Sequence, residues 1–526
     1  MRHDQAFPSV TPPPVAEQPS SSADEMAAET SPKGMPYAHL LTALVTLLCI
    51  DNLLLLRFLG TRWDIMAAAG LAASAAIAAF HRLGLRHRER IPASRLLVCL
   101  CAAVIVLMLG GEGRLFYANL DWFIRDAVLD DMIRWPWPFA YAGHGAPLLL
   151  RAPLGMYLLP AIAGKIGGQG AADAALLGQN SLVLAIILAL GSLMFATPRA
   201  RRIALVVVLL FSGLDTVGEF LVNPDRLLPL SAHINDWAGI QYTAQLTQAF
   251  WVPQHAMCGW LGAVLFMLWR DERIGLAVFL GVVPLMLLWS PLGVMGTLPF
   301  AALAGIESLL RRRVMLVDIG LPLLALAVAI IPALYLQTDA GRVGIHLEAL
   351  PPALYILFEM LEAVPFLAAV WFGSRVFRFG TATYALVVAC ILGFPFVVVG
   401  ASVDFVMRVS IPALAILSVM VADLLAGRAS NGPRAFLIVV LTIGALNPAR
   451  ELYRAIRFTP VPTASCDLWT EWDRVFPDFG KQTYFAPVAA LPGALHPSPK
   501  AFAAPPFAAP TSSRSCGLDR WRRVRF

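Results

Sequence analysis

The chain has 526 residues, of which 58% are hydrophobic and 14% charged, and its formal net charge is +6. Soluble domains are about 45–50% apolar and about 25% charged, so this composition excludes a soluble enzyme. A nucleic-acid partner is not indicated either, because the basic residues form short clusters between long apolar segments, the pattern that orients membrane proteins. These clusters are His81–Arg90, Pro198–Arg202, Arg270–Arg273, Arg311–Arg313, Ser374–Arg378 and Arg428–Arg434.

The amino-terminal residues 1–35 are rich in Pro, Ser, Ala and Glu, which is typical of a disordered tail. Residues 36–447 are predicted to form an all-α transmembrane domain, because apolar segments of about 17–25 residues match the hydrocarbon thickness and lipid-embedded backbone must be helical. We expect about thirteen transmembrane helices in a multi-pass protein of the inner (plasma) membrane. They lie at about 38–58, 63–80, 94–110, 172–196, 203–222, 254–269, 274–290, 291–310, 314–336, 352–372, 381–400, 411–426 and 435–447.

The basic clusters predict the orientation of these helices. With a cytoplasmic amino terminus, every cluster lies on the cytoplasmic side, and the Pro- and Ala-rich tail 448–526 lies outside. The short apolar segment Pro153–Ile166 is predicted to be a re-entrant or interfacial helix, because counting it as a span would move Arg199, Arg201 and Arg202 outside. The outer segments are Gly111–Ala152, Asn223–Pro253, Gln337–Pro351 and Ala401–Ser410.

The first outer segment combines acids and tryptophans with apolar residues at helical spacing, which predicts an amphipathic helix on the membrane surface. Its four-residue spacings, Asp121 to Arg125 and Asp130 to Arg134, fit simple surface ion pairs. The alternative is catalytic: a carboxylate at the membrane face acts as general base, since partial burial can tune its pKa. Asp121 is then the first candidate and Asp126 a second, with Trp122 and Arg125 contacting the substrate.

Further polar residues lie at the ends of later spans. Asp215 and Glu219 share a helix face near the outer end of 203–222, and acids at membrane depth are functional candidates, unless they reach the surface. Asp215 is a third candidate base. Gln254 and His255 begin the span at 254–269, where they either bind substrate or serve as structural hydrogen-bond partners.

Asp404 and Arg408 open the span at 411–426 and are four residues apart, so they either form a plain ion pair or bind substrate together. The guanidinium fork of an arginine suits the phosphate of a lipid carrier, because it can bind two phosphate oxygens at once.

Two of the seven cysteines, Cys466 and Cys516, lie outside the predicted membrane domain. We predict that they form a disulfide, because the tail has few apolar anchors and lies in an oxidising compartment in the predicted topology. The alternative is two unrelated thiols in a disordered tail.

The chain lacks a P-loop, a dinucleotide fingerprint, a His-Glu-x-x-His motif and a Gly-x-Ser-x-Gly elbow, which favours a membrane-delivered substrate over a nucleotide. In organisation it resembles the GT-C type of membrane glycosyltransferase, whose many spans surround a long acidic outer loop. The acidic loop follows the third span here, where that family has it after the first, so the hairpin before it would be an addition. The segments that carry the resemblance are Asp121–Pro136, Leu150–Pro153, Tyr157–Pro160, Phe211–Asp215, Phe250–His255, Trp289–Gly293 and Asp404–Pro412, and several of them look like segments of uncharacterised bacterial relatives.

The resemblance implies transfer of a sugar from a polyprenyl-phosphate donor to an acceptor on the extracytoplasmic side. It implies no organic cofactor and leaves a divalent metal open, with no metal ligands predicted; membrane lipids are the other expected partner. The alternative is a transporter or flippase of a lipid-linked sugar or polymer, supported by acids at predicted membrane depth. Those acids are Asp51, Asp173, Asp215, Glu219 and Glu307.

Overall fold

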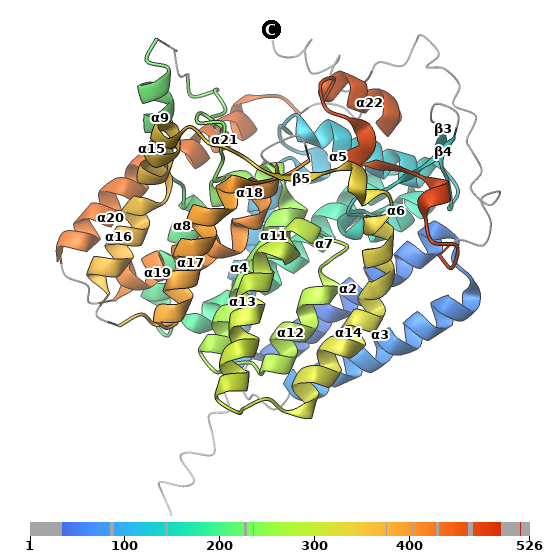
Figure 1. Ribbon diagram of the computed structural model, residues 1–526, viewed down its shortest axis with the longest axis horizontal. Helices are drawn as coiled ribbons and strands as arrows, with labels where there is room; N and C mark the ends of the chain where they lie inside the picture. The colour runs from blue at the N-terminus through green and yellow to red at the C-terminus, as the bar shows by residue number, and fades with distance from the viewer. Residues whose placement is uncertain are drawn as a thin grey trace, which may run out of the picture.

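The computed structural model describes residues 34–84, 89–142, 146–225, 229–234, 236–374, 376–400, 404–427, 431–460, 466–495 and 516. Most of these residues form a bundle of helices (Figure 1). The predicted disordered tail lies almost wholly outside them. The helices are α2 (Tyr37–Leu59), α3 (Trp63–Gly84), α4 (Ala93–Leu109), α5 (Asp121–Arg134), α6 (Gly155–Gly167), α7 (Gln169–Gly191), α8 (Pro198–Leu210), α9 (Asp215–Val222), α10 (Gln245–Trp251), α11 (Pro253–Arg270), α12 (Leu276–Leu285), α13 (Pro291–Leu310), α14 (Leu316–Gln337), α15 (Pro352–Glu362), α16 (Val364–Gly373), α17 (Thr381–Gly393), α18 (Asp404–Val409), α19 (Ile411–Ala426), α20 (Asn431–Gly444), α21 (Leu446–Arg457) and α22 (Leu468–Val475).

Strands are few and short, and they pair antiparallel in three small sheets. All three sheets join segments that are distant in sequence, because β1 pairs with β2, β4 pairs with both β3 and β7, and β5 pairs with β6. The strands are β1 (Met35–Pro36), β2 (Arg90–Ile91), β3 (Tyr141–Ala142), β4 (Pro147–Leu150), β5 (Ile345–Leu347), β6 (Val397–Val399) and β7 (Phe485–Pro487).

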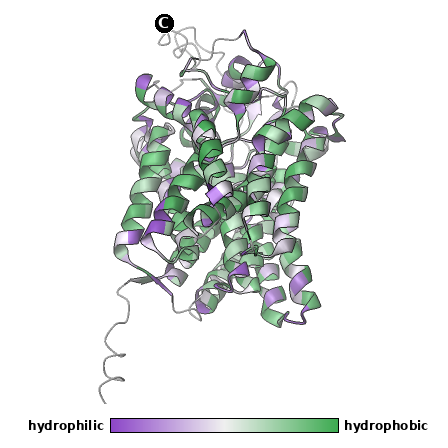
Figure 2. Cartoon of the chain, turned by 90° about the vertical axis from the view of Figure 1, so that its left-hand side faces the viewer, coloured by the Kyte–Doolittle hydropathy of each residue, from purple (hydrophilic) through white to green (hydrophobic). Residues whose placement is uncertain are grey.

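The bundle has the character of a multi-pass membrane protein. Apolar residues cover most of the helices, and hydrophilic residues gather mainly at the two ends of the bundle (Figure 2). Seven described helical segments are long and apolar enough to cross a membrane, and α15 with α16, bent by 51°, would make an eighth. Each of the thirteen predicted spans overlaps one helix or two successive helices, but four of those helices are short and α11 is not among the seven, so thirteen spans are not confirmed.

Two ends of the bundle can be told apart along α11. This helix begins at Pro253, beside α10 and near α5, and ends at Arg270, which pairs with Glu307. Eighteen residues of α-helix are about 27 Å long, so the two ends are separated by most of a bilayer. We call them the α5 end and the arginine end.

Helix α5 forms where the sequence predicts a helix, with an acid in its first turn and Arg134 in its last, as the helix dipole favours. It does not lie exposed on a surface, however. Trp122, Phe123 and Val128 are buried, because α5 packs between α6 and α22. The prediction of a surface helix is therefore wrong: the carboxyl-terminal tail covers the face that would have met lipid headgroups.

The carboxyl-terminal region differs from the prediction in two ways. The last helical segment does not end at 447 but continues through α21 to Arg457. Beyond it, residues 466–495 fold onto the α5 end, where α22 packs on α5 and β7 pairs with β4. The predicted disulfide is confirmed: Cys466 and Cys516 are bonded, with their Cα atoms 5.2 Å apart.

Candidate functional site

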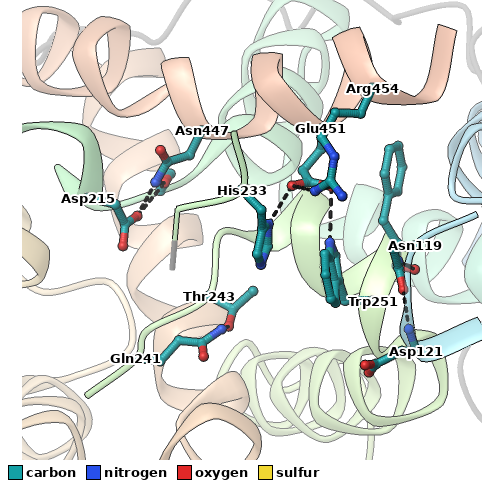
Figure 3. Close-up of polar contacts among 12 residues, drawn as sticks. Asn119, Asp121, Asp215, His233, Gln241, Thr243, Trp251, Asn447, Glu451 and Arg454 are labelled. Carbon is teal, nitrogen blue, oxygen red and sulfur yellow. Dashed lines mark hydrogen bonds and ion pairs between the residues drawn. The ribbon is translucent and has the colours of Figure 1, made fainter. Parts of the chain in front are cut away.

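The start of α5 is fixed to the end of α10 by two hydrogen bonds. Asn119 Nδ2 and Trp122 Nε1 both donate to the carbonyl oxygen of Phe250, over 2.8 and 3.0 Å. The Asn119 side chain also accepts the Asp121 backbone N–H at 3.1 Å (Figure 3). Asp121 is thereby held at the first turn of a helix, with its carboxylate 24% exposed.

Two ion pairs predicted from four-residue spacings are present at this end. Arg125 Nη2 lies 3.3 Å from an Asp121 carboxylate oxygen, and Arg408 Nη1 lies 2.7 Å from Asp404. Neither pair uses the whole guanidinium group: Arg125 Nη1 and Arg408 Nε are buried and have no hydrogen-bond partner. A buried donor without a partner is costly. Several other arginines of the described chain, Arg454 among them, also have one. Two cationic groups therefore have hydrogen-bonding capacity left for an anion.

The start of α11 contributes Gln254 and His255, both buried. Pro253 occupies the first helical position, where its missing N–H costs nothing. His255 Nδ1 is 2.7 Å from the hydroxyl of Ser290, the residue that caps α13, and Gln254 Oε1 is buried without a partner. Hydrogen bonding thus orients the His255 ring, and Gln254 adds an unused acceptor.

A tyrosine from the tail joins these groups. Tyr484 is partly buried, and desolvation raises the pKa of its phenol. The same phenol interacts electrostatically with Arg125, Arg408, Asp121 and Asp404. Both arginines also act on His255. The structure thus gathers most of the predicted site residues from α5, α11 and α18. We call this group the α5 site: Asp121, Arg125, His255, Asp404, Arg408 and Tyr484.

Asp126, the second candidate base, belongs to a different cluster. It lies 3.1 Å from Arg114, which also pairs with Asp173 at 2.8 Å. Burial raises the pKa of the Asp126 carboxyl to about 7, and the neighbouring charge of Arg114 opposes that rise. This cluster joins the start of α5 to α7, so its contacts are those of a structural ion pair.

Asp215, the third candidate base, is also distant from the α5 site. It is fully buried at the start of α9 and is hydrogen-bonded by Asn447 and by Ser212. Figure 3 shows Asp215 on the far side of Glu451 from Asp121. Asp215 therefore does not lie together with Asp121 and Arg408.

Between these two acids lies a polar cluster centred on Glu451. Its carboxylate contacts His233 Nδ1 at 2.7 Å, Trp251 Nε1 at 3.0 Å and Arg454 Nη1 at 3.1 Å (Figure 3). The His233 ring stacks on Trp251 with centroids 4.0 Å apart. Every carboxylate oxygen of Glu451 is thus in use. We call this group, with the neighbouring acid, the α21 network: Asp215, His233, Trp251, Asn447, Glu451 and Arg454.

Of the α21 network only Asp215 was predicted from the sequence, and Tyr484 was not predicted, because residues 448–526 were expected to form a separate tail. A signal was present: Asn447, Glu451 and Arg454 follow one another at spacings of four and three residues, which puts them on one helix face. No comparable local pattern marks Tyr484, whose position depends on pairing between β4 and β7.

The remaining acids at predicted membrane depth have partners. Asp51 accepts a hydrogen bond from Trp289 Nε1 at 2.8 Å, and Glu307 forms a two-pronged pair with Arg270 at 2.6 Å for each contact. Among the described residues, one group has metal-ligand geometry, but two of its three members are the disulfide-bonded cysteines: Cys466, Glu471 and Cys516. That group is therefore not a metal site.

Comparison with known proteins assigns no family. No protein-family model matches the chain, and neither a curated protein nor a solved structure is significantly similar to it.

Proposed function

We propose that this protein is a membrane glycosyltransferase of the GT-C type, which moves a sugar from a polyprenyl-phosphate donor to an acceptor hydroxyl at the α5 end. One observation carries the proposal. Arg125 and Arg408 come from helices far apart in the sequence, act on the same histidine and tyrosine, and each retain an unpartnered guanidinium nitrogen. Such a pair suits a phosphate whose charge grows as the sugar leaves.

The reaction would use Asp121 as the general base. The acceptor hydroxyl gives its proton to Asp121 while its oxygen bonds to the anomeric carbon. The bond from that carbon to the phosphate oxygen breaks, and its electron pair stays on the phosphate. Arg125 and Arg408 then stabilise the leaving phosphate. His255, oriented by its hydrogen bond with Ser290, and Tyr484 are suited to hydrogen-bond the donor.

Accessibility favours Asp121 over the other two candidate bases. A base must come within hydrogen-bond reach of the proton that it removes. The Asp121 carboxylate is 24% exposed and is engaged by a long 3.3 Å ion pair. Asp126 shares Arg114 with a second acid, and Asp215 is fully buried. We therefore assign the base role to Asp121 and structural roles to the other two.

The test supplies purified protein in liposomes with a panel of polyprenyl-phosphate monosaccharides and measures the release of polyprenyl phosphate. At least one donor should be cleaved by the wild type and not by Asp121→Asn. The matched control is Asp64→Asn, which removes an exposed carboxylate paired with Arg62 and should leave cleavage unchanged. Absence of cleavage for every donor and acceptor class, with a folded protein, would exclude the proposal.

The proposed orientation has the arginine end in the cytoplasm. The Cys466–Cys516 disulfide supports it, because this bond lies in the tail that packs on the α5 end and disulfides persist in oxidising compartments. Reporter fusions before Gly34 and after residue 495 should report opposite sides of the plasma membrane. The same side for both would reject the proposed orientation.

A transporter or flippase is the second candidate, and one feature favours it. The segment 198–222 breaks before Asp215, and the bent pair α15–α16 breaks after Glu362. The two carboxyl groups interact electrostatically at these breaks, and Asp215 Oδ1 and Glu362 Oε2 are both buried without a hydrogen-bond partner. Gly213 allows the two broken segments to approach each other, since a Cβ at this position would lie 1.6 Å from a Glu362 oxygen. Broken helices that bring polar groups together are typical of transporter sites.

One experiment distinguishes the glycosyltransferase from the transporter. The double variant Asp215→Asn, Glu362→Gln keeps the shapes of both side chains but removes both titratable groups. A transferase centred on the α5 site keeps cleaving its donor in this variant. If the protein is a transporter, the double variant no longer moves the lipid-linked sugar between liposome leaflets, and the wild type cleaves no donor.

A further inference from the structure

The arginine half of the bundle contains a cavity of about 430 Å³ that the proposed reaction does not use. Helices α4, α7, α8, α11 and α19 surround it, and its interior is apolar, formed by residues such as Ile187, Val264, Ala415 and Val419. Its volume lies within the range of about 300–1,000 Å³ typical of small-molecule sites. Several of its lining residues are exposed on the outer surface of the bundle; Val98, for example, is 57% exposed. The cavity is thus lined in part from the lipid-facing surface.

Three arginines belong to the same cavity: Arg95 at the start of α4, and Arg201 and Arg202 at the start of α8. Arg201 Nη1 donates to the carbonyl oxygens of Phe195 and Ala196, at 2.9 and 2.8 Å, which fixes the guanidinium group in position. Arg95 and Arg201 are near enough for their charges to interact unfavourably. Within the described ranges, no acidic side chain forms an ion pair with any of the three.

The apolar cavity and its arginines together indicate which class of ligand binds there. An apolar cavity in contact with the membrane accepts a hydrocarbon chain, and adjoining guanidinium groups without acidic partners accept a phosphate. Basic pockets between membrane helices bind anionic lipid headgroups in this way. We propose that the cavity is a binding site for an anionic phospholipid of the leaflet at the arginine end, with one acyl chain inside and the phosphate on Arg95 and Arg201. This inference does not depend on the proposed transferase activity.

A simpler account is that the arginines only reach toward the membrane surface, as basic residues near helix ends often do. Two features separate the accounts. Surface arginines would be free to move apart, whereas Arg201 is tied to two carbonyl oxygens beside Arg95. Their positions at the rim of an apolar cavity also provide a site for both parts of a lipid.

The test uses the full-length protein in a neutral detergent, with lipid binding followed by native mass spectrometry. Phosphatidylglycerol should bind in preference to phosphatidylcholine. The double variant Arg95→Gln, Arg201→Gln should bind phosphatidylglycerol about thirtyfold less tightly, since each basic residue near a headgroup contributes roughly a fivefold factor. Val264→Phe, which fills the cavity and keeps every charge, should also weaken binding. The matched control is Arg199→Gln, on the same helix but outside the cavity lining, and it should bind like the wild type.

Three outcomes would overturn the proposal. Equal binding of phosphatidylglycerol and phosphatidylcholine would show that the arginines select no headgroup. Unchanged binding in both the double variant and Val264→Phe would place the lipid elsewhere. Displacement of bound phosphatidylglycerol by millimolar inorganic phosphate, with Val264→Phe behaving like the wild type, would assign the arginines to a free anion.

Discussion

The α5 site and the α21 network lie at the same end of the bundle and contain the same kinds of residue, but they differ in how far their acidic side chains are exposed. In the α21 network, Glu451 has three partners and Arg454 pairs with it at 3.1 Å, with side chains only 6% and 4% exposed. In the α5 site, carboxylates are partly exposed and both arginines keep an unpartnered donor. Arg454 Nε of the α21 network is also buried without a partner, so the difference lies in the acids. A buried, hydrogen-bonded acid stabilises one structure, whereas an accessible acid beside a cation with an unused donor can meet a ligand. The types of polar residue alone therefore do not distinguish a structural network from a ligand-binding site.

The largest effect should come from Asp121→Asn in the α5 site. The asparagine keeps the size of the side chain and removes its basicity, so donor turnover should fall about 10²–10⁴-fold, the contribution of a general base. The unfolding temperature should stay within a degree or two of the wild type, because this carboxylate is partly exposed and its ion pair is long. The liposome assay measures the expected loss of turnover, and thermal unfolding measures the expected unchanged stability. Full turnover in a well-expressed Asn variant would move the base role to another residue.

The opposite pattern is expected for Glu451→Gln in the α21 network. The change leaves the buried Arg454 without a counter-charge, and loss of one partner from a buried pair costs about 3–5 kcal/mol of stability. Thermal unfolding should show the loss, while the turnover of the protein that remains folded should change little. Glu272→Gln, at an exposed pair with Arg313, is the control and should have almost no effect. A stable but inactive Glu451→Gln protein would contradict the division of roles.

Arg408→Lys should have an intermediate effect. Lysine keeps the charge but loses the planar fork, so donor use should weaken about tenfold, equivalent to roughly 1.4 kcal/mol, if Arg408 binds phosphate. Asp404→Asn should do less harm, because it removes only the partner. The apparent affinity for the donor in each variant is the measurement. Equal damage from both single changes, together with rescue by exchanging the two residues, would identify a plain ion pair.

The sequence predicted the local features well and the long-range ones poorly. Each predicted span overlaps one helix or two successive helices, since apolar periodicity acts within one segment, although thirteen spans are not confirmed. The ion pairs of Asp121 with Arg125 and of Asp404 with Arg408 also follow from four-residue spacing. The exposure of α5 could not be predicted, because it depends on where residues 466–495 fold. Separating Asp215 from the α5 site likewise required the positions of α15 and α21.

A pH-dependent effect is expected at Asp131, which connects α5 to the tail that brings Tyr484 to the site. Its buried carboxylate accepts hydrogen bonds from Tyr141 Oη at 2.7 Å and from the Leu468 backbone N–H at 2.9 Å. Burial raises the pKa of this group to about 7, although the hydrogen bond from the Leu468 backbone and that from Tyr141 oppose the rise. Between about pH 4 and pH 7 the folded protein therefore holds a proton that the unfolded chain has released. The stabilisation from this group is complete below pH 4 and is lost as the pH rises through about 7.

Asp131→Asn stays neutral and can still accept both hydrogen bonds, so its stability should not fall across that range. We expect the wild type to lose stability relative to Asp131→Asn as the pH rises from 4 to 8, with the unfolding midpoint and proteolysis of the tail as measurements. Asp478→Asn, an exposed acid of the same tail, is the control and should follow the wild-type curve. Parallel curves for the wild type and Asp131→Asn would mean that this carboxylate is solvated when the tail is bound. The tail would then be a loose cover over the α5 site, and the contribution of Tyr484 to donor binding would have to be dropped.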